Sequence, residues 1–342
     1  MSTTSSSPRK RRTTASSRQA AAFAAAFAAA LLTAACGARG RETFVTYFNG
    51  DHGVSLRQAA TWRTDQAERE GVWYRYFLAP GAGPQGGAPV SVTLLAGAMT
   101  VPLDEYAEAY LAGHTVASTR PEERQGVGGR SWVFSSADGK TSGRLLLLAR
   151  GDRVLGLHAQ GAAAAVAAQA AVLDEMWSSL TIERPDLYPV TAFKDQVASL
   201  GLPASWRETR RFSGGGTLVA NYVSPPLAVD KGGQAVHASL AVTFEAVPGG
   251  GGLAEYYEPT RRRLGENFQV RSHASFKGGY VDIMRTETPV AVSFVKRFYF
   301  AEGGRGCSLS FEAREDVFPR ASRWADYIVS TLRFGGTGEA SK

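Results

Sequence analysis

Ala60-Thr61-Trp62-Arg63 and Ala204-Ser205-Trp206-Arg207 are the same short motif, occurring twice in a chain of 342 residues. A similar apolar stretch precedes each motif at the same spacing, Gly53-Val54-Ser55-Leu56 in the first case and Val197-Ala198-Ser199-Leu200 in the second. The offset between the copies is 144 residues (204 − 60). Because self-similarity at a fixed spacing decides the architecture before any local pattern does, the sequence predicts a duplicated domain.

The correspondence continues towards the C-terminus of each copy. The alternating stretch VSVTL at 90–94 matches LAVTF at 240–244, and LDEYAEAYL at 103–111 matches LAEYYEPTRRRL at 253–264, both at an offset of 150 (240 − 90). The pair Gly128-Gly129 matches Gly278-Gly279 at the same offset. The offset changes only across segments rich in Gly and Pro, as expected where surface loops differ in length.

Each copy predicts the same order of elements. An extended segment leads to the Trp, alternating strands such as 72–78 follow, and a helix begins near residue 102 or 253, with acidic residues in its first turn. Pro259 should shorten or kink the second of these helices. More strands and a closing amphipathic helix complete the copy. This order predicts an α+β fold, an antiparallel sheet flanked by helices.

The repeated Trp turns, the two mid-copy helices, the Gly-Gly strand entries and the closing helices that end SSLTI (178–182) or STLRF (330–334) resemble the Mog1/PsbP/DcrB-like family. The resemblance implies two tandem α/β/α sandwich domains at 44–184 and 190–335, joined by a linker at 185–189. Members of that family serve as binding or assembly factors and share no catalytic motif. The resemblance therefore implies a binding role and transfers no site residue.

The N-terminal segment decides the expected location. The expected signal, residues 1–35, contains five basic residues, all before residue 19, and no acidic residue. The apolar run AAAFAAAFAAALLTAAC follows these basic residues at 20–36 and ends at Cys36; this is the layout of an export signal. Leu32-Thr33-Ala34-Ala35-Cys36 resembles the lipobox of bacterial lipoproteins, although Thr33 stands where Leu is usual. The resemblance implies lipid attachment at Cys36, with 36–43 as a tether. The alternative is an uncleaved anchor, since residues 19–38 carry no charge over about the length that spans a bilayer.

Net charge does not indicate a nucleic-acid partner. The chain carries +7, and removal of the five basic residues of the signal leaves +2 (7 − 5). The basic excess lies mostly in a segment that export would discard, so no nucleic-acid binding is expected. The tail at 336–342 is expected to be disordered.

The sequence contains no motif typical of a catalytic, metal-binding or phosphate-binding site. The five histidines never stand four residues apart, and there is no HExxH, CxxC, GxSxG or phosphate-loop motif, so no catalytic site, metal or cofactor is predicted. Cys307 is expected to be a buried strand residue. Arg150-Gly151-Asp152 is expected to form a hairpin, and Arg261-Arg262-Arg263 a solvated helix face.

Trp62 and Trp206 are the most prominent duplicated side chains. Aromatic residues at matching places in two copies usually pack a strand onto its sheet, and the alternative is contact with a ligand or partner. The leading prediction is a non-catalytic lipoprotein of the bacterial cell envelope, exported and facing the periplasm or exterior, that binds an envelope protein partner through its two domains. The alternatives are a small-ligand carrier and an envelope hydrolase.

Overall fold

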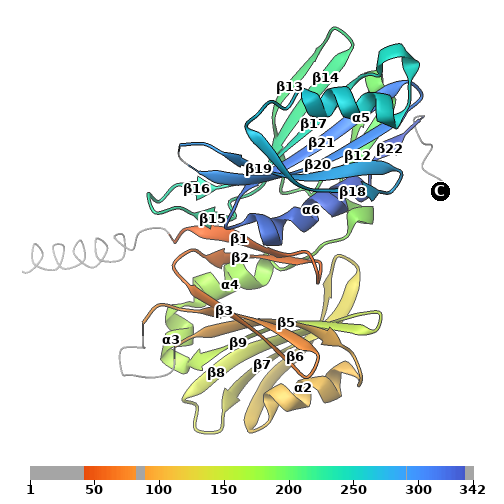
Figure 1. Ribbon diagram of the computed structural model, residues 1–342. Helices are drawn as coiled ribbons and strands as arrows, with labels where there is room; N and C mark the ends of the chain where they lie inside the picture. The colour runs from red at the N-terminus through yellow and green to blue at the C-terminus, as the bar shows by residue number, and fades with distance from the viewer. Residues whose placement is uncertain (1–41, 82–88, 290, 336–342) are drawn as a thin grey trace, which may run out of the picture. The chain divides into compact units, whose positions relative to one another are not determined.

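Residues 42–81, 89–289 and 291–335 are described in the computed structural model (Figure 1). From Thr43 onward the chain forms one compact unit. The expected signal segment with Cys36 and the expected tail at 336–342 lie outside the described residues. No helix of the described chain combines the length and the apolar character that a membrane crossing requires.

A seven-stranded antiparallel sheet forms the centre of the first copy, in the order β3-β4-β5-β9-β8-β7-β6. Consecutive strands are joined mostly by tight hairpins, and Arg150 and Arg153 are the last pair of the β8–β9 hairpin around Gly151. The strands are β3 (Arg63–Arg69), β4 (Val72–Leu78), β5 (Ser91–Ala98), β6 (His114–Arg124), β7 (Val127–Ser136), β8 (Thr141–Arg150) and β9 (Arg153–Ala162).

The second copy repeats this topology. Its seven-stranded sheet has the order β13-β14-β17-β21-β20-β19-β18, which is the same path through seven antiparallel strands. A two-stranded hairpin, β15 (Ala228–Val229) with β16 (Ala235–Val236), is inserted after β14. The sheet strands are β13 (Arg207–Gly214), β14 (Thr217–Val223), β17 (Ser239–Ala246), β18 (Phe268–Phe276), β19 (Gly279–Glu287), β20 (Val292–Glu302) and β21 (Arg305–Arg314).

Each copy also has a small three-stranded sheet that the sequence patterns did not predict. In the first copy β2 (Val54–Ala59) lies between β1 (Phe44–Asn49) and β10 (Thr181–Ile182). In the second copy β12 (Ala198–Gly201) lies between β11 (Val190–Phe193) and β22 (Arg333–Phe334). The two residues that close each copy thus pair with a strand near its start, which ties the ends of the copy together.

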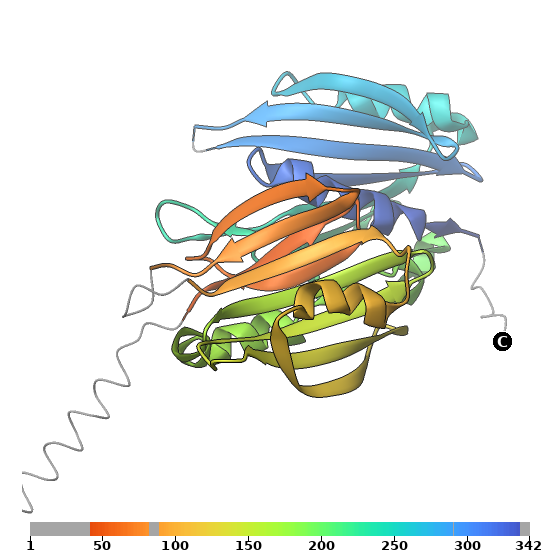
Figure 2. The same ribbon diagram turned by 90° about the horizontal axis from the view of Figure 1, so that it is seen from below.

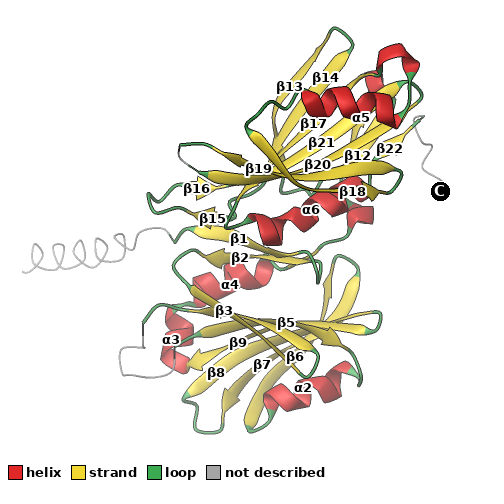
Figure 3. Ribbon diagram, in the orientation of Figure 1, coloured by secondary structure: helices red, strands yellow, loops and turns green. Residues whose placement is uncertain are grey.

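Helices cover both faces of each large sheet (Figures 2 and 3). On one face lie α2 (Leu103–Leu111) and α5 (Leu253–Arg262), each packed over a smaller apolar cluster. On the other lie α3 (Ala163–Ala168), α4 (Ala170–Ser178) and α6 (Phe318–Ser330), which enclose the main cores. The predicted fold class is confirmed: two tandem α+β domains, each an antiparallel sheet flanked by helices.

The duplicated glycines have a shared physical role. A Cβ on Gly129 would overlap the carbonyl oxygen of Leu147 on the neighbouring strand, and a Cβ on Gly279 would overlap that of Tyr299. Only glycine allows the strands to approach so closely at these places. Gly129 and Gly279 are therefore packing requirements of the fold, whereas a Cβ on Gly128 or Gly278 would meet no atom within 4 Å.

Pro259 does not shorten its helix as the sequence predicted. Helix α5 continues to Arg262, and the backbone N–H of Arg263 still donates to the carbonyl oxygen of Pro259. Buried Tyr256 and Tyr257 hold the helix to its sheet. Burial of this aromatic face compensates for the hydrogen bond that proline removes.

Candidate functional site

The site with the clearest chemical character is a pocket of about 460 Å³ at the end of β10. Strand β2, the 3₁₀ turn η1 (Pro185–Leu187), residues 203–205 and helix α6 all contribute to its wall. Much of the lining is apolar, and its apolar side chains include those of Leu56, Ile182, Leu187, Pro203 and Trp324. Such volumes and linings are typical of pockets that bind small groups.

Glu183 is the acidic residue of this pocket, and only 4% of it is exposed. Its Oε1 accepts a hydrogen bond from Ser55 Oγ at 2.8 Å, and its Oε2 accepts one from Tyr188 OH at 2.6 Å. Its backbone N–H donates to Gly53 O at 2.8 Å. The carboxyl group is therefore held in one orientation by groups from β2 and from the turn that follows β10.

The local sequence explains how Tyr188 reaches Glu183. Pro185 begins the 3₁₀ turn, where its fixed φ suits a first helical position. The Arg184 side chain donates two hydrogen bonds, of 2.9 and 2.5 Å, to the carboxylate of Asp186. This tight turn reverses the chain within five residues. The phenol of Tyr188 is thereby brought back onto the carboxyl group.

Glu183 has no cation as a partner within the described chain. The nearby rim arginines are engaged elsewhere, Arg57 with Glu175 and Arg184 with Asp186. Burial raises the pKa of Glu183 above its ordinary value, and the hydrogen bonds from Tyr188 and Ser55 offset only part of that rise. A carboxyl group in this setting holds either a proton or an external cation.

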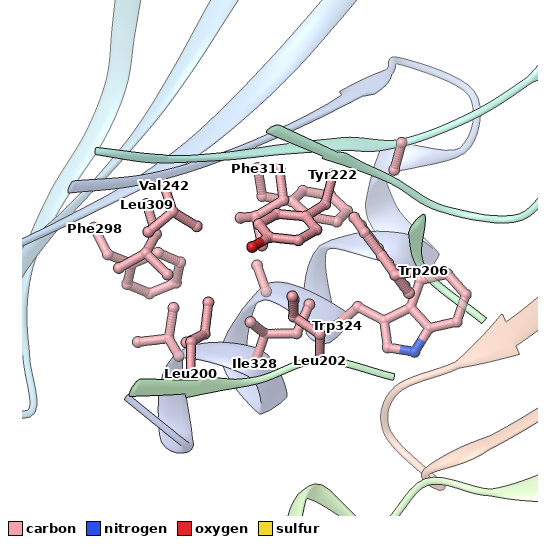
Figure 4. Packing of buried hydrophobic residues seen from close by; sticks show 14 of the residues in the cluster. Leu200, Leu202, Trp206, Tyr222, Val242, Phe298, Leu309, Phe311, Trp324 and Ile328 are labelled. Atoms are coloured by element: carbon pink, nitrogen blue, oxygen red, sulfur yellow. The ribbon is translucent and has the colours of Figure 1, made fainter. Parts of the chain in front are cut away.

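Trp62 and Trp206 lie in the cores of the two copies, with 4% and 8% of their surfaces exposed. The ring of Trp206 packs edge-on against Trp324 at a centroid distance of 5.7 Å and lies 6.1 Å from that of Phe311 (Figure 4). Neither Trp62 nor Trp206 is among the residues that line the Glu183 pocket. Their matching positions reflect matching contributions to packing.

Cys307 is buried on β21, and burial raises the pKa of its thiol well above the ordinary value. This environment disfavours the reactive thiolate. No group of three or more His, Cys, Asp or Glu suited to a metal occurs among the described residues. His158 is buried against Phe134, and burial lowers its pKa to about 4.

A second polar cluster lies under α5. Asp282 on β19 is completely buried, accepts hydrogen bonds from Tyr257 OH at 3.2 Å to each oxygen, and contacts His273 Nδ1 at 2.7 Å. In the first copy the equivalent of Asp282 is Trp132 (282 − 150), and it packs in an apolar cluster. Asp282, Tyr257 and His273 bond to one another, so the three side chains form an internal network.

The run Arg261-Arg262-Arg263 is largely neutralised by acidic neighbours. Its three side chains lie 3.9, 3.9 and 2.6 Å from carboxylate oxygens of Asp282, Glu258 and Glu245 respectively. The structure gives this run no isolated basic character, and it supplies no argument for an acidic partner.

Sequence reasoning missed Glu183. Its residue type is usually exposed, and it begins the stretch ERPDLYP, whose Pro residues indicate a linker. The second copy offers no hint, because Gly335 follows β22 where Glu183 follows β10. Only the pairing of β10 with β2 reveals that this position is internal.

No family model matches the chain, and no curated protein matches it either. Solved structures with similar folds include the cyanobacterial PsbP protein (CyanoP) of Synechocystis sp. PCC 6803, with 10% identity and a TM-score of 0.32, covering 43% of this chain and 96% of that one. The Ran-binding protein Mog1p of Saccharomyces cerevisiae has 10% identity and a TM-score of 0.30, covering 44% of this chain and 100% of its own.

LpqN of Mycobacterium tuberculosis, described as involved in cell envelope biogenesis, has 13% identity and a TM-score of 0.31, covering 43% of this chain and 90% of its own. PsbP and Mog1 give their names to the family that the sequence resembles, and both are among these similar structures. Identities this low and TM-scores this far below 0.5 support no statement about activity, ligand or partner. The fold class follows from the strand order and helix placement described above.

Proposed function

We propose that this chain is a non-catalytic binding protein of the bacterial cell envelope, held at a membrane by lipid on Cys36, whose Glu183 pocket takes an ammonium group on an apolar stem. One observation carries the proposal: a buried carboxyl group, oriented by two hydroxyl groups, lines a mainly apolar pocket and has no ion-pair partner in the described chain. The two arginines of the lining, Arg57 and Arg184, pair with other carboxylates. An ammonium ion would supply the missing charge and the donors that a carboxylate accepts.

The energetics of Glu183 favour such a ligand. Burial disfavours the charged form of its carboxyl group, and an opposite charge at hydrogen-bonding distance reverses that effect. Leu56, Ile182 and Leu187 would contact the methylene groups of the ligand. The charge would select the head group, and the apolar wall would select the stem.

A lysine side chain of an envelope protein is the leading source of that ammonium group. It combines the apolar stem with a terminal –NH₃⁺, and two tandem domains offer a wide surface around one inserted residue. A free amine metabolite is the second candidate, favoured by a volume of about 460 Å³, which lies within the range of small-molecule pockets.

A hydrolase is the least supported alternative. The residues that line the pocket include one carboxylate, Glu183, and no histidine. General acid–base hydrolysis needs an acid and a base within reach of each other. The lining therefore supports binding in preference to bond cleavage.

The test uses Nα-acetyl-lysine methylamide as a mimic of a lysine side chain, titrated into the full chain by calorimetry. Glu183→Gln keeps the shape of the side chain and should weaken binding by roughly tenfold or more, since a hydrogen-bonded charge is lost. Glu105→Gln, at an exposed position on α2, is the matched control and should bind as the wild type does. Equal affinity in all three proteins would refute the pocket assignment.

A further comparison separates the two sources. A photo-crosslinking residue at Leu187, which lines the pocket and is exposed, should capture a protein in living cells, and the Glu183→Gln change should abolish that capture. Binding of cadaverine without any captured protein would favour the small-ligand carrier.

The anchor is tested independently. Cys36→Ala should move the protein from the membrane fraction to the soluble fraction, because lipid attachment depends on the thiol. Complete retention of this variant in the membrane would favour the uncleaved apolar anchor.

A further inference from the structure

Two arginines face each other at the end of the β8–β9 hairpin. Arg150 and Arg153 are direct cross-strand partners, with only Gly151 and Asp152 between them. Like charges in this relationship destabilise a hairpin. The equivalent pair in the second copy is Glu302 with Arg305, which has opposite charges. The first copy thus has two like charges at a place where the second copy has a pair of opposite charges.

The two arginines form no ion pair in the described part of the chain. Within the described chain neither Arg150 nor Arg153 has a carboxylate oxygen at ion-pair distance. Arg153 donates instead to His52 Nδ1 at 2.8 Å. A guanidinium can only donate, so Nδ1 is an acceptor and the ring is neutral. Burial, and then the charge of Arg153, lower the pKa of His52, which keeps it in this form.

In the second copy the equivalent arginine, Arg305, donates to neutral acceptors. Gln196 occupies the place of His52 (196 − 144), and Arg305 donates to Gln196 Oε1 at 3.3 Å and to Asp195 O at 2.7 Å. There the single arginine is satisfied by neutral acceptors and faces Glu302. In the first copy a second arginine replaces that glutamate, and the positive charge at the hairpin end is doubled.

A cavity lies at this place. It measures about 290 Å³ and is lined by Asp51, His52, Arg150, Arg153, Leu155 and Tyr327. Asp51 is the acidic residue of the lining, and Arg323 Nε lies 3.3 Å from its Oδ1. Tyr327 OH donates to Gly50 O at 2.6 Å. The volume is at the lower end for ligand pockets, which suits a small ion or a single head group.

We propose that Arg150 and Arg153 form a binding site for a phosphate group in this cavity. The guanidinium fork matches two phosphate oxygens, and two such forks from opposite strands can hold one tetrahedral anion. The bound anion supplies the negative charge that Glu302 supplies in the second copy. This site takes a ligand of opposite charge to that of the Glu183 pocket and does not depend on the function proposed for that pocket.

The key variant is Arg150→Glu, because it recreates the Glu–Arg pair that the second copy tolerates. The full chain in non-ionic detergent is unfolded thermally at increasing inorganic phosphate and constant ionic strength. The midpoint of the wild type should rise with phosphate, and Arg150→Glu should weaken phosphate binding by roughly tenfold to a hundredfold. Without phosphate, this variant should unfold at a higher temperature than the wild type, since two like charges no longer face each other.

Arg210→Glu, at an exposed position on β13, makes the same change of charge away from the cavity and should respond to phosphate as the wild type does. Arg150→Gln is a second variant that removes the charge without introducing a new one, and it should also lose the response. If the wild type does not respond to phosphate at all, or if the Arg150 variants respond as strongly as it does, free phosphate is not the ligand.

The same titration with dihexanoylphosphatidylglycerol below its micelle concentration distinguishes a lipid head group from a free phosphate. A response to this lipid alone, lost in the Arg150 variants, supports the site and assigns it to a lipid head group. A response to inorganic phosphate assigns it to a free phosphate. The proposal would be overturned if neither probe raised the unfolding midpoint of the wild type. It would also be overturned if the Arg150 variants responded as strongly as the wild type.

Discussion

The ring of Phe48 on β1 stacks on that of Trp324 on α6, with centroids 4.3 Å apart and an interplanar angle of 14°. Phe48 is 1% exposed and belongs to the main apolar core of the second copy, although its strand belongs to the small sheet of the first. Backbone contacts accompany it, since Thr46 N donates to Pro226 O at 2.6 Å. The first strand of one copy therefore completes the core of the other.

Phe48→Ala should destabilise the protein by about 3–5 kcal/mol, because it removes a fully buried ring and leaves a cavity beside Trp324. Urea unfolding followed by tryptophan fluorescence measures this loss. Phe212→Ala is the control, since Phe212 is 54% exposed and a surface substitution should change stability by only about 0.5 kcal/mol. A small effect at Phe48 would show that the two copies fold independently.

Glu183→Gln should change how stability depends on pH. Folding raises the pKa of Glu183 above its ordinary value of 4.5, so the folded state binds a proton that the unfolded state has already released. Stability of the wild type must then fall as pH rises from about 4.5 towards the folded pKa, and the amide variant escapes this loss. The variant should therefore be more stable than the wild type at pH 8.

At pH 4 the two proteins should be nearly equal, since both side chains are then neutral. Urea unfolding at pH 4, 6 and 8 measures the free energy of unfolding of both proteins. The difference between the two values is compared across pH, because other groups titrate equally in both proteins. A difference that is constant over this range would contradict the raised pKa.

Asp282→Ala should cost about 1–3 kcal/mol of stability, because Tyr257 and His273 lose their buried hydrogen-bond acceptor. Asp174→Ala is the matched control: its carboxylate pairs with Arg144 at 2.6 Å on the surface, and exposed pairs contribute at most about 1 kcal/mol. Chemical denaturation measures both. Equal effects for the two variants would mean that the network under α5 is not needed for stability.

Cys307 should resist alkylation by iodoacetamide at pH 8 in the folded protein and react once the protein is unfolded in urea. Burial both excludes the reagent and raises the pKa of the thiol. Mass spectrometry of the peptide that contains Cys307 reports the extent of modification. Rapid modification under native conditions would place this strand at an opening of the core.

The fold was predictable because its signals are local and occur twice. The apolar pattern of β5 specifies a strand, which the structure buries on both faces, and that of α2 specifies a helix. The second copy repeats them in β17, whose residues do alternate in burial, and in α5. The small sheets were not predictable, because β10 and β22 have only two residues each. Segments so short carry no periodicity, and their pairing depends on contacts between the ends of each copy.

The sequence by itself determined the duplication and the α+β class and favoured the burial of Trp62 and Trp206, since repeated apolar patterns specify which faces must leave water. The tertiary structure alone decided that Glu183 lines a pocket, that Arg150 and Arg153 line a common cavity, and that Phe48 packs in the core of the other copy. The physical reason is that the environment of a charged or aromatic side chain depends on residues distant in the chain. Ser55 reaches Glu183 across 128 positions, and no local pattern records such a contact.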